Sequence, residues 1–217
     1  MDVVYPLKAQ AKSGTATNEF RYSLRTLKNL PHDRVWVVGW KPDWVRNVEF
    51  IPTVQRHSKF INAFQNLQAV LPQVSDEFVL MNDDFFILTP HERIPVLYRD
   101  QWIETSVLRS TKKSVVGFLN RQGVTDPVSY ELHIPMAFNR ALLSETLEKA
   151  KGVHIAGYQR TVYGNLNQIG GTPVPDCKVR GGENLVGWDF ASTSERTFQG
   201  KVGQVIQKLF PDPSPYE

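Results

Sequence analysis

The sequence predicts an α/β fold with a mostly parallel, doubly wound central sheet flanked by helices. Three observations lead to this class. Strand-like and helix-like segments alternate over roughly the first ninety residues, their apolar residues recur with the period of a strand or a helix, and the composition is that of a globular chain. Of the 217 residues, 41% are hydrophobic and 22% are charged, which suffices for a sizeable core. In such sheets, ligands bind in the crevice beyond the carboxyl ends of the strands.

The elements of the first half are predicted from local patterns. Short runs rich in Val, Ile and Phe predict strands at residues 2–7, 35–38, 48–51 and 78–81. Apolar residues at helical spacing predict helices at 19–30 and 58–71. The first helix follows Asn18, a favourable N-cap, and ends at Pro31. Its residues Phe20, Leu24 and Leu27 form one apolar stripe.

The second half is less regular. We expect connecting helix and loop at 89–112, a short strand at 114–119, a helix at 140–151 and a final helix at 202–210. Between Gly152 and Gly187 the pattern is weak, and glycine pairs with nearby prolines mark loops that could close over a ligand. The predicted organisation is a single domain over 1–217, with an irregular C-terminal half and an extended tail at 211–217.

Charge and cysteine content exclude several kinds of protein. Lys and Arg number 25 against 22 Asp and Glu, so the net charge is +3, and no basic run indicates a nucleic-acid partner. Cys177 is the only cysteine, which excludes an intramolecular disulfide and a cysteine-rich zinc site and favours a reducing compartment. No stretch approaches the ~20 apolar residues that span a bilayer, and the N-terminus lacks a signal-peptide pattern. We therefore expect a soluble, cytoplasmic protein without a membrane span.

The most informative feature is the pair Asp83 and Asp84, which interrupts the apolar run 78–88. Two adjacent carboxylates are costly to bury unpaired and repel each other, so we expect them to face a cleft, a cation or both. A divalent cation such as Mn²⁺ or Mg²⁺ is a natural partner, because hard cations take oxygen ligands and share them with the phosphates of a substrate. The pair thus indicates chemistry on a phosphorylated donor. The alternative is turn chemistry, since short acidic side chains also favour bends.

Three cations follow one side of the first predicted helix. Arg21, Arg25 and Lys28 stand at i, i+4 and i+7, and they could simply form a solvated face. Arg21, however, lies near the start of the helix, close to the expected end of the first strand. There its planar guanidinium could bind the oxygens of a diphosphate. Lys59, at the start of the second helix, is a weaker candidate for the same contact.

A second group of reactive side chains lies at Glu131 and His133, just before Pro135. In extended backbone these two side chains share one face. Histidine can ligate a metal or move a proton near neutral pH, and glutamate can act as a general base or nucleophile. Asp176 and Asp189 are two later acidic residues that are harder to place. Glu131, His133 and Asp189 remain three alternatives for the group that activates an acceptor.

Taken together, these residues resemble the blocks of the Stealth family of sugar-phosphate transferases. The similar blocks are 2–5, 18–25 and 78–86 with its Asn-Asp-Asp sequence, and 133–135 is similar to the family's His-x-Pro block. The same blocks, with an ending such as 210–217, also resemble small glycosyltransferases encoded by actinobacterial phages. The chain is short for a Stealth protein, and Tyr5 precedes Pro6 where that family usually continues with a Trp-Val-Asp-like segment. The phage-type enzyme is therefore favoured.

Both groups imply a GT-A-like, Rossmann-like fold, a nucleoside diphosphate sugar as donor and a divalent cation on the donor diphosphate. Residues 1–90 would then form the nucleotide-sugar-binding half and 91–210 the acceptor and catalytic half. The candidate metal ligands are Asp84, Asp83 and His133. The candidate donor-binding residues are Tyr5, Arg21, Arg25, Lys59, Asn82 and Asp83. The candidate catalytic residues are Glu131, His133 and Asp189.

The function expected from the sequence is a metal-dependent glycosyltransferase that moves a sugar to a hydroxyl of a protein or glycan. The resemblance implies a phage structural protein as one such acceptor, modified in the host cytoplasm. One alternative keeps the donor but transfers sugar 1-phosphate and so releases a nucleoside monophosphate. Another is a non-catalytic sugar-binding module in which the acidic pair holds a structural ion. A metal-dependent nuclease is the most distant alternative, because the chain lacks both a basic tract and a dense acidic cluster.

Overall fold

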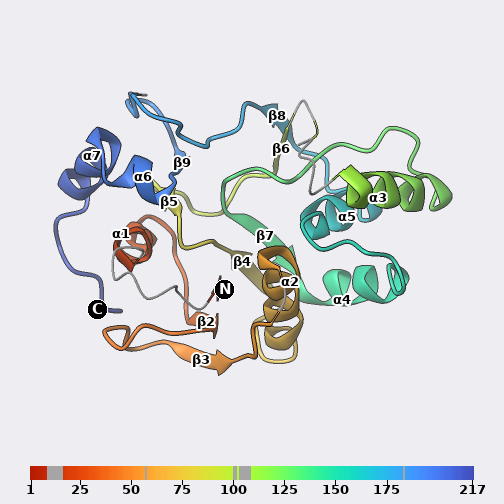
Figure 1. Cartoon of the computed structure of the whole chain (residues 1–217), viewed down its shortest axis with the longest axis horizontal. Coiled ribbons are helices and arrows are strands. Elements are labelled where there is room, and N and C mark those ends of the chain that lie inside the picture. The colour runs from red at the N-terminus through yellow and green to blue at the C-terminus, as the bar shows by residue number, and fades with distance from the viewer. Residues whose placement is uncertain (9–16, 57, 100–101, 103–108, 183) are drawn as a thin grey trace.

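The structure is a computed structural model that describes residues 1–8, 17–56, 58–99, 102, 109–182 and 184–217. Its central sheet has five strands in the order β3-β2-β1-β4-β7 (Figure 1). These strands are β1 (Asp2–Leu7), β2 (Val35–Gly39), β3 (Glu49–Pro52), β4 (Glu77–Leu80) and β7 (Met136–Asn139). Strands β1 to β4 run parallel to their neighbours, and β7 lies antiparallel to β4 at the edge. The predicted α/β class with a mostly parallel sheet is confirmed.

Both faces of the sheet are covered, which is why its central strand is almost continuously apolar. Val3 and Tyr5 of β1 pack with Phe20 and Leu24 of α1 (Thr17–Thr26) on one face. Val4, one residue out of phase, packs on the other face, as the alternation of side chains along a strand requires. That second face is covered by α2 (Lys59–Val70), α4 (Arg140–Lys149) and α5 (Gln159–Leu166) (Figure 1).

The ends of the predicted helices shift by a few residues. Helix α1 begins at Thr17, before the expected N-cap, and its last turn is a 3-10 helix, η1 (Leu27–Asn29). Helix α2 begins as predicted, because the side chain of Ser58 accepts a hydrogen bond from the backbone N–H of Ile61 at 3.5 Å. The apolar stripe of α1 faces the sheet, so the periodicity identified the buried side correctly.

In the part of the chain that the structure describes, the residues after β4 form two small sheets and five helices beside the main sheet. Strand β5 (Phe85–Ile87) pairs antiparallel with β9 (Phe190–Ser192), and β6 (Leu97–Arg99) pairs parallel with β8 (Thr172–Val174). The further helices are α3 (Arg109–Arg121), α6 (Glu195–Phe198) and α7 (Lys201–Leu209), in addition to α4 and α5 above. Of the predicted connection 89–112, residues 100–101 and 103–108 lie outside the described part of the chain.

The strand predicted at 114–119 is wrong, because these residues lie inside α3. Val115, Phe118 and Leu119 are buried, and their i, i+3, i+4 spacing is that of a helix face packed on α5. Helix α5 was not predicted at all. Its buried residues include Gln159, Arg160, Thr161 and Asn165, so no apolar stripe of helical period marks this segment in the sequence.

The chain ends on a segment, 211–217, that runs back beside α1 and the loop after β2 (Figure 1). Arg25 holds its last residue with a paired ion bridge, Nε to Glu217 Oε1 at 2.7 Å and Nη2 to Oε2 at 2.9 Å. The hydroxyl of Tyr216 lies 2.6 Å from the imidazole of His32. We call 211–217 the C-terminal strap, and its contacts make it part of the folded core region.

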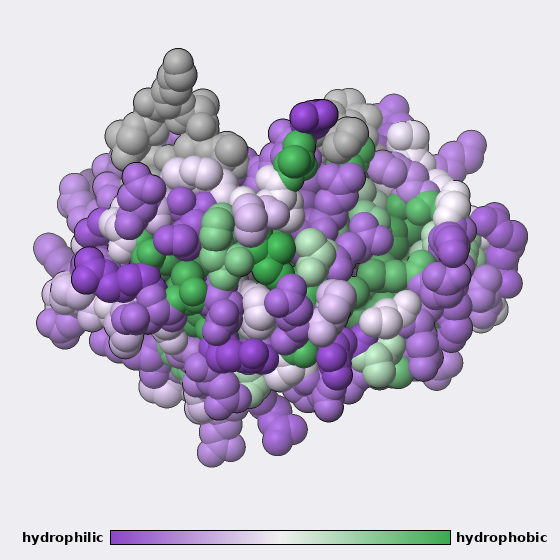
Figure 2. Space-filling view, turned by 90° about the horizontal axis from the view of Figure 1, so that it is seen from below, coloured by the Kyte–Doolittle hydropathy of each residue, from purple (hydrophilic) through white to green (hydrophobic). Residues whose placement is uncertain are grey.

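The face shown in Figure 2 is largely hydrophilic, with apolar residues gathered in patches between the hydrophilic ones. None of the helices that the structure describes is both long and apolar enough to cross a membrane.

Candidate functional site

The site lies at the point in the central sheet where the crossover connections switch from one face of the sheet to the other. The connection after β1 places α1 on one face, and the connection before β4 places α2 on the other, so a crevice opens between the carboxyl ends of these two neighbouring strands. Asp83 and Asp84 follow β4 at this point, in a turn closed by the N–H of Phe85 donating to Asn82 O at 3.2 Å. The pair therefore occupies both a strand end and a turn.

Three carboxylates gather here, and we call Glu19, Asp83 and Asp84 the acidic cluster. Glu19 comes from the first turn of α1, is almost fully buried, and accepts a hydrogen bond from the hydroxyl of Thr193. Burial, and then the charges of Asp84 and Asp83, raise the pKa of Glu19 to about 7. Burial and the charge of Asp84 likewise raise the pKa of Asp83 to about 6. Burial thus makes two of the three carboxyl groups hard to ionise.

Lys178 is the direct partner of the acidic cluster. Its Nζ lies 2.6 Å from Asp84 Oδ2 and 3.0 Å from Ser192 Oγ, and it also donates to the carbonyl of Thr193. The hydroxyl of Ser192 donates to the same Asp84 oxygen at 3.1 Å. Both charged side chains are mostly buried, at 20% and 21% exposure. Sequence reasoning did not identify Lys178 or Glu19, because neither belongs to a motif that includes the aspartates.

Two of the predicted metal ligands fit a divalent cation. Mg²⁺ and similar ions are commonly held by one or two carboxylates and completed by phosphate oxygens of a substrate, and adjacent Asp83 and Asp84 can supply such a pair. The described residues contain no group of three His, Cys, Asp or Glu side chains that could hold a metal by itself. The predicted metal-binding role of His133 stays a prediction. A cation held by Asp83 and Asp84 would need further oxygen ligands.

Beside the acidic cluster lies a cavity of about 170 Å³, which we call the histidine pocket. Phe60, Leu80 and Phe85 supply part of its apolar wall. Its polar wall is formed by Asn82, Glu131, His133, Gln159 and Arg160. Pro6 of β1 and Leu80 of β4 place the pocket at the crevice between these strands. Sequence reasoning named three of these five polar residues, Asn82, Glu131 and His133, all from motifs with a local signal.

His133 is oriented by Asp176. The imidazole Nδ1 lies 2.8 Å from Asp176 Oδ2, and the backbone N–H of His133 donates to Asp176 Oδ1 at 3.0 Å. Burial opposes ionisation of Asp176, but the hydrogen bonds from His133 and the charge of Arg99, whose Nη1 is 3.1 Å away, outweigh it and lower the pKa of this carboxyl. Because Nδ1 faces a carboxylate, we assign the proton to Nδ1 and a lone pair to Nε2.

Glu131 has a different environment from His133, although the two are close in sequence. Its Oε1 accepts a hydrogen bond from the backbone N–H of Thr161 at 3.0 Å and so satisfies the first turn of α5. Burial raises the pKa of Glu131 to about 7. The neighbouring Arg160 donates to the carbonyls of Leu132 at 3.2 Å and Ile134 at 2.7 Å, the two residues that flank His133. Glu131 and Arg160 therefore fix the segment that carries the histidine.

Three predicted donor-binding residues are engaged elsewhere. Tyr5 is fully buried, its hydroxyl lies 3.0 Å from Ser23 Oγ, and burial raises its pKa, so it is a core residue. Arg25 binds the C-terminal strap through Glu217, and Arg21 reaches the same carboxylate at 3.5 Å while its guanidinium stacks over Trp44. The local sequence shows neither that Tyr5 is buried nor that the two arginines pair with a residue at the other end of the chain.

The remaining predicted residues divide between the site and a distant position. Asn82 lines the histidine pocket, and Lys59 is the first residue of α2, with its ammonium 5.0 Å from the ring centre of the pocket residue Phe60. Asp189 precedes β9 at the end opposite Asp84, because the antiparallel pairing sets Phe190 against Ile87 and Ser192 against Phe85. It is 60% exposed and accepts a hydrogen bond from Thr89 at 2.6 Å. The structure does not bring Asp189 to the site.

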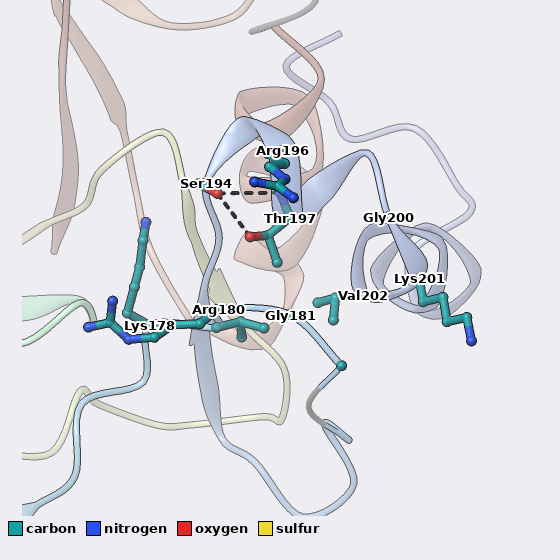
Figure 3. Close-up of a pocket in the computed structure, with 11 residues that line it drawn as sticks. Lys178, Arg180, Gly181, Ser194, Arg196, Thr197, Gly200, Lys201 and Val202 are labelled. Carbon is teal, nitrogen blue, oxygen red and sulfur yellow. Dashed lines mark hydrogen bonds between the residues drawn. The ribbon is translucent and has the colours of Figure 1, made fainter.

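On the other side of Asp84 lies a larger cavity of about 580 Å³, which we call the basic cavity. Its described lining contains four cations, Lys178, Arg180, Arg196 and Lys201, and no carboxylate. The hydroxyls of Ser194 and Thr197 line it as well, 2.9 Å apart (Figure 3). Lys178 therefore lines the basic cavity and also contacts Asp84 of the acidic cluster.

Neither a protein-family model nor a curated protein matches this sequence. Among solved structures, the chain is similar to a protein from Desulfovibrio desulfuricans G20, solved at 1.90 Å and provisionally named a nucleotide-diphospho-sugar transferase. The identity is 13%, the TM-score is 0.37, and the match covers 81% of this chain and 79% of that one. A likeness of this extent does not decide which reaction the present site performs.

Proposed function

We propose that this protein is a metal-dependent glycosyltransferase that moves a sugar from a nucleoside diphosphate sugar to a hydroxyl of a protein or glycan. One observation carries the proposal: an oriented His133–Asp176 pair borders a pocket at the carboxyl ends of β1 and β4, next to two strand-end carboxylates. The resemblance of the sequence blocks to phage-encoded glycosyltransferases adds a phage virion protein as one candidate acceptor.

His133 is the proposed general base. With Nδ1 donating to Asp176, its Nε2 accepts the proton of the acceptor hydroxyl as that oxygen bonds to the anomeric carbon of the sugar. The bond from this carbon to the diphosphate oxygen breaks, and the nucleoside diphosphate leaves with the electron pair. Asp176 stabilises the imidazolium that forms, because its carboxylate is already ionised and hydrogen-bonded to the ring.

The acidic cluster is the proposed anchor for the donor diphosphate. A divalent cation, when bound, supplies positive charge that stabilises the leaving diphosphate. Asp83 and Asp84 would hold this cation, as proposed from the sequence. Asn82 lines the histidine pocket and Lys59 lies over its residue Phe60, which supports the proposal that both would contact the donor. Arg160 acts on the segment 132–134 and keeps His133 in position.

The test is release of nucleotide from a panel of nucleoside diphosphate sugars in the presence of Mn²⁺, with the product identified by mass. We expect a nucleoside diphosphate, no release after chelation, and a fall of about 10²–10⁴-fold in His133→Ala, the usual contribution of a general base. His91→Ala is the matched control, because His91 also faces an aspartate, Asp189 at 3.9 Å, but does not line the pocket.

Other products would favour the alternatives. Release of a nucleoside monophosphate would identify transfer of sugar 1-phosphate. Binding of a donor without any turnover would identify a sugar-binding module. Equal rates in wild type and His133→Ala would remove the histidine from the chemistry.

A further inference from the structure

Lys178 occupies the boundary between regions of opposite charge. Its ammonium contacts Asp84 at 2.6 Å, and the same side chain lines the basic cavity with Arg180, Arg196 and Lys201. In Figure 3, Lys178 stands on one side of the hollow, and Arg196 and Lys201 stand across from it. The side chain of Lys178 thus contacts the carboxylate of Asp84 and also lines a cavity whose described lining has no carboxylate.

We propose that Lys178 is an exchangeable counterion of the metal site. Its ammonium neutralises Asp84 in the metal-free protein, yields this carboxylate to a divalent cation, and then turns into the basic cavity. The cation in this inference is the one in the proposed function, so the inference rests on that proposal.

Competition follows from the contacts at one oxygen. Asp84 Oδ2 already accepts hydrogen bonds from Lys178 and Ser192, so its lone pairs are in use. A cation bound to this carboxylate would lie close to the ammonium, and two like charges in a mostly buried place repel strongly. Serine can rotate its hydroxyl to accept instead of donate, whereas an ammonium is always a donor. Lys178 is therefore the group that has to leave.

The basic cavity gives the released ammonium a place to go. Lysine is a flexible chain with a strongly hydrated end, and a cavity of about 580 Å³ has room for both the end and its water. Within the part of the chain that the structure describes, Arg196 and Lys201 form no ion pair. Once Lys178 no longer neutralises Asp84, its ammonium is available to an anionic ligand of the cavity, such as a phosphate group. Metal binding at Asp84 would in this way raise the affinity of the cavity for phosphate.

The decisive experiment measures Mn²⁺ affinity directly, by titration followed with electron paramagnetic resonance, so that no turnover is needed. Lys178→Met removes the competing ammonium, and we expect it to bind Mn²⁺ about tenfold more tightly than wild type. Lys178→Arg keeps a competing cation and should stay within about threefold of wild type. Lys201→Met is the matched control, because it removes one lysine from the same cavity with no contact to the acidic cluster.

Each outcome decides the proposal. Tighter binding in Lys178→Met alone supports it, also where binding to wild type is too weak to detect. Unchanged or weaker binding in Lys178→Met overturns it, and so does an equal gain in Lys201→Met, which would show a general effect of net charge. Melting in chelator, followed by circular dichroism, confirms that each variant is folded, and Lys178→Gln replaces the methionine variant if that one is not.

The two proposals can fail separately. Nucleotide release with no gain in Mn²⁺ affinity for Lys178→Met would leave the glycosyltransferase standing and remove the exchange. The expected gain in affinity without turnover of any donor would keep the exchange and remove the transferase.

Discussion

The carboxylate of Asp176 contacts both the imidazole of His133 and the guanidinium of Arg99. The hydrogen bonds from His133 and the charge of Arg99 keep it ionised despite its burial, so it is a fixed acceptor for the imidazole Nδ1–H. A neutral group in its place would hold the ring more weakly and would not stabilise an imidazolium. In the proposed mechanism Asp176 is a positioning residue, because it would act on the substrate only through His133.

Asp176→Asn should lower kcat by about 10²–10⁴-fold and change KM little, since the loss concerns the proton transfer and not donor binding. The double variant with His133→Ala should be no slower than His133→Ala alone, as expected for two residues that act as a unit.

Asp189→Asn is the matched control for this prediction. Asp189 also lies near a histidine, but it is exposed and lies beyond the far end of β9, so its rate should stay within about twofold of wild type. A strong loss in Asp189→Asn, with full activity in Asp176→Asn, would reverse the two roles.

The residues of the site could be predicted from sequence where a short segment contains the signal. Asp83 with Asp84 and Glu131 with His133 are close pairs within apolar surroundings, and all four lie at the site. Lys178 is 94 positions from its partner Asp84, and Asp176 is 43 positions from His133. Such pairs form only when the fold closes, and a lone lysine or aspartate in a loop has no periodicity to mark it.

At the scale of elements, the first half of the chain was predictable because each strand and helix buries one regular stripe. The second half was not, for two physical reasons. Helix α3 has a β-branched, aromatic run that resembles a strand, and α5 is buried on nearly all sides. Strands β7 and β9 have four and three residues, so their pattern is too short to distinguish from loop.

The C-terminal strap is short, but we expect its contacts to contribute strongly to the free energy of unfolding. Arg25 and Glu217 are each only 9% exposed, and Arg25 also donates to the carbonyls of Phe210 at 3.1 Å and Pro211 at 2.8 Å. Arg25→Met leaves a buried carboxylate and two carbonyls without their donor, so we expect a loss of about 3–5 kcal/mol in the free energy of unfolding, measured in urea.

Arg21→Met is the control for the strap, since it removes a neighbouring arginine that reaches the same carboxylate. Arg21 is 36% exposed and 3.5 Å from Glu217, so its loss should cost less than about 1 kcal/mol. Equal losses in the two variants would mean that the strap is held by net charge and not by the paired bridge of Arg25.

At the scale of the whole molecule, the site concentrates carboxyl groups that are hard to ionise. Burial raises the pKa of Glu19 and Glu131 to about 7 and of Asp83 to about 6, whereas the unfolded chain ionises these groups near their ordinary values of 4.5 and 3.8. Between about pH 4 and pH 7 the folded protein therefore holds protons that the unfolded chain has released. By linkage, these groups make the free energy of unfolding fall as pH rises through this window.

Glu19→Gln removes one of the carboxyl groups that stay protonated in the folded protein within this pH window. Relative to wild type, the variant should gain stability of the order of 2 kcal/mol as pH rises from about 4.5 to about 7.5, measured by urea unfolding in chelator. Glu145→Gln on α4 is the control, because Glu145 is exposed and its curve should run parallel to wild type. A constant difference between Glu19→Gln and wild type at every pH would contradict the raised pKa.

The pairing of β5 with β9 has a consequence for how the molecule is built over time. It joins residues 85–87 to 190–192 and thereby sets Asp84 beside Lys178, Ser192 and Thr193. Closing a loop of this length has a high entropic cost before any contact rewards it, and such contacts slow folding. The sheet formed by β1 to β4 can assemble first from nearer segments. A newly synthesised chain would therefore form the sheet of β1 to β4 early and the candidate site last. An assembled site would then indicate that folding is complete.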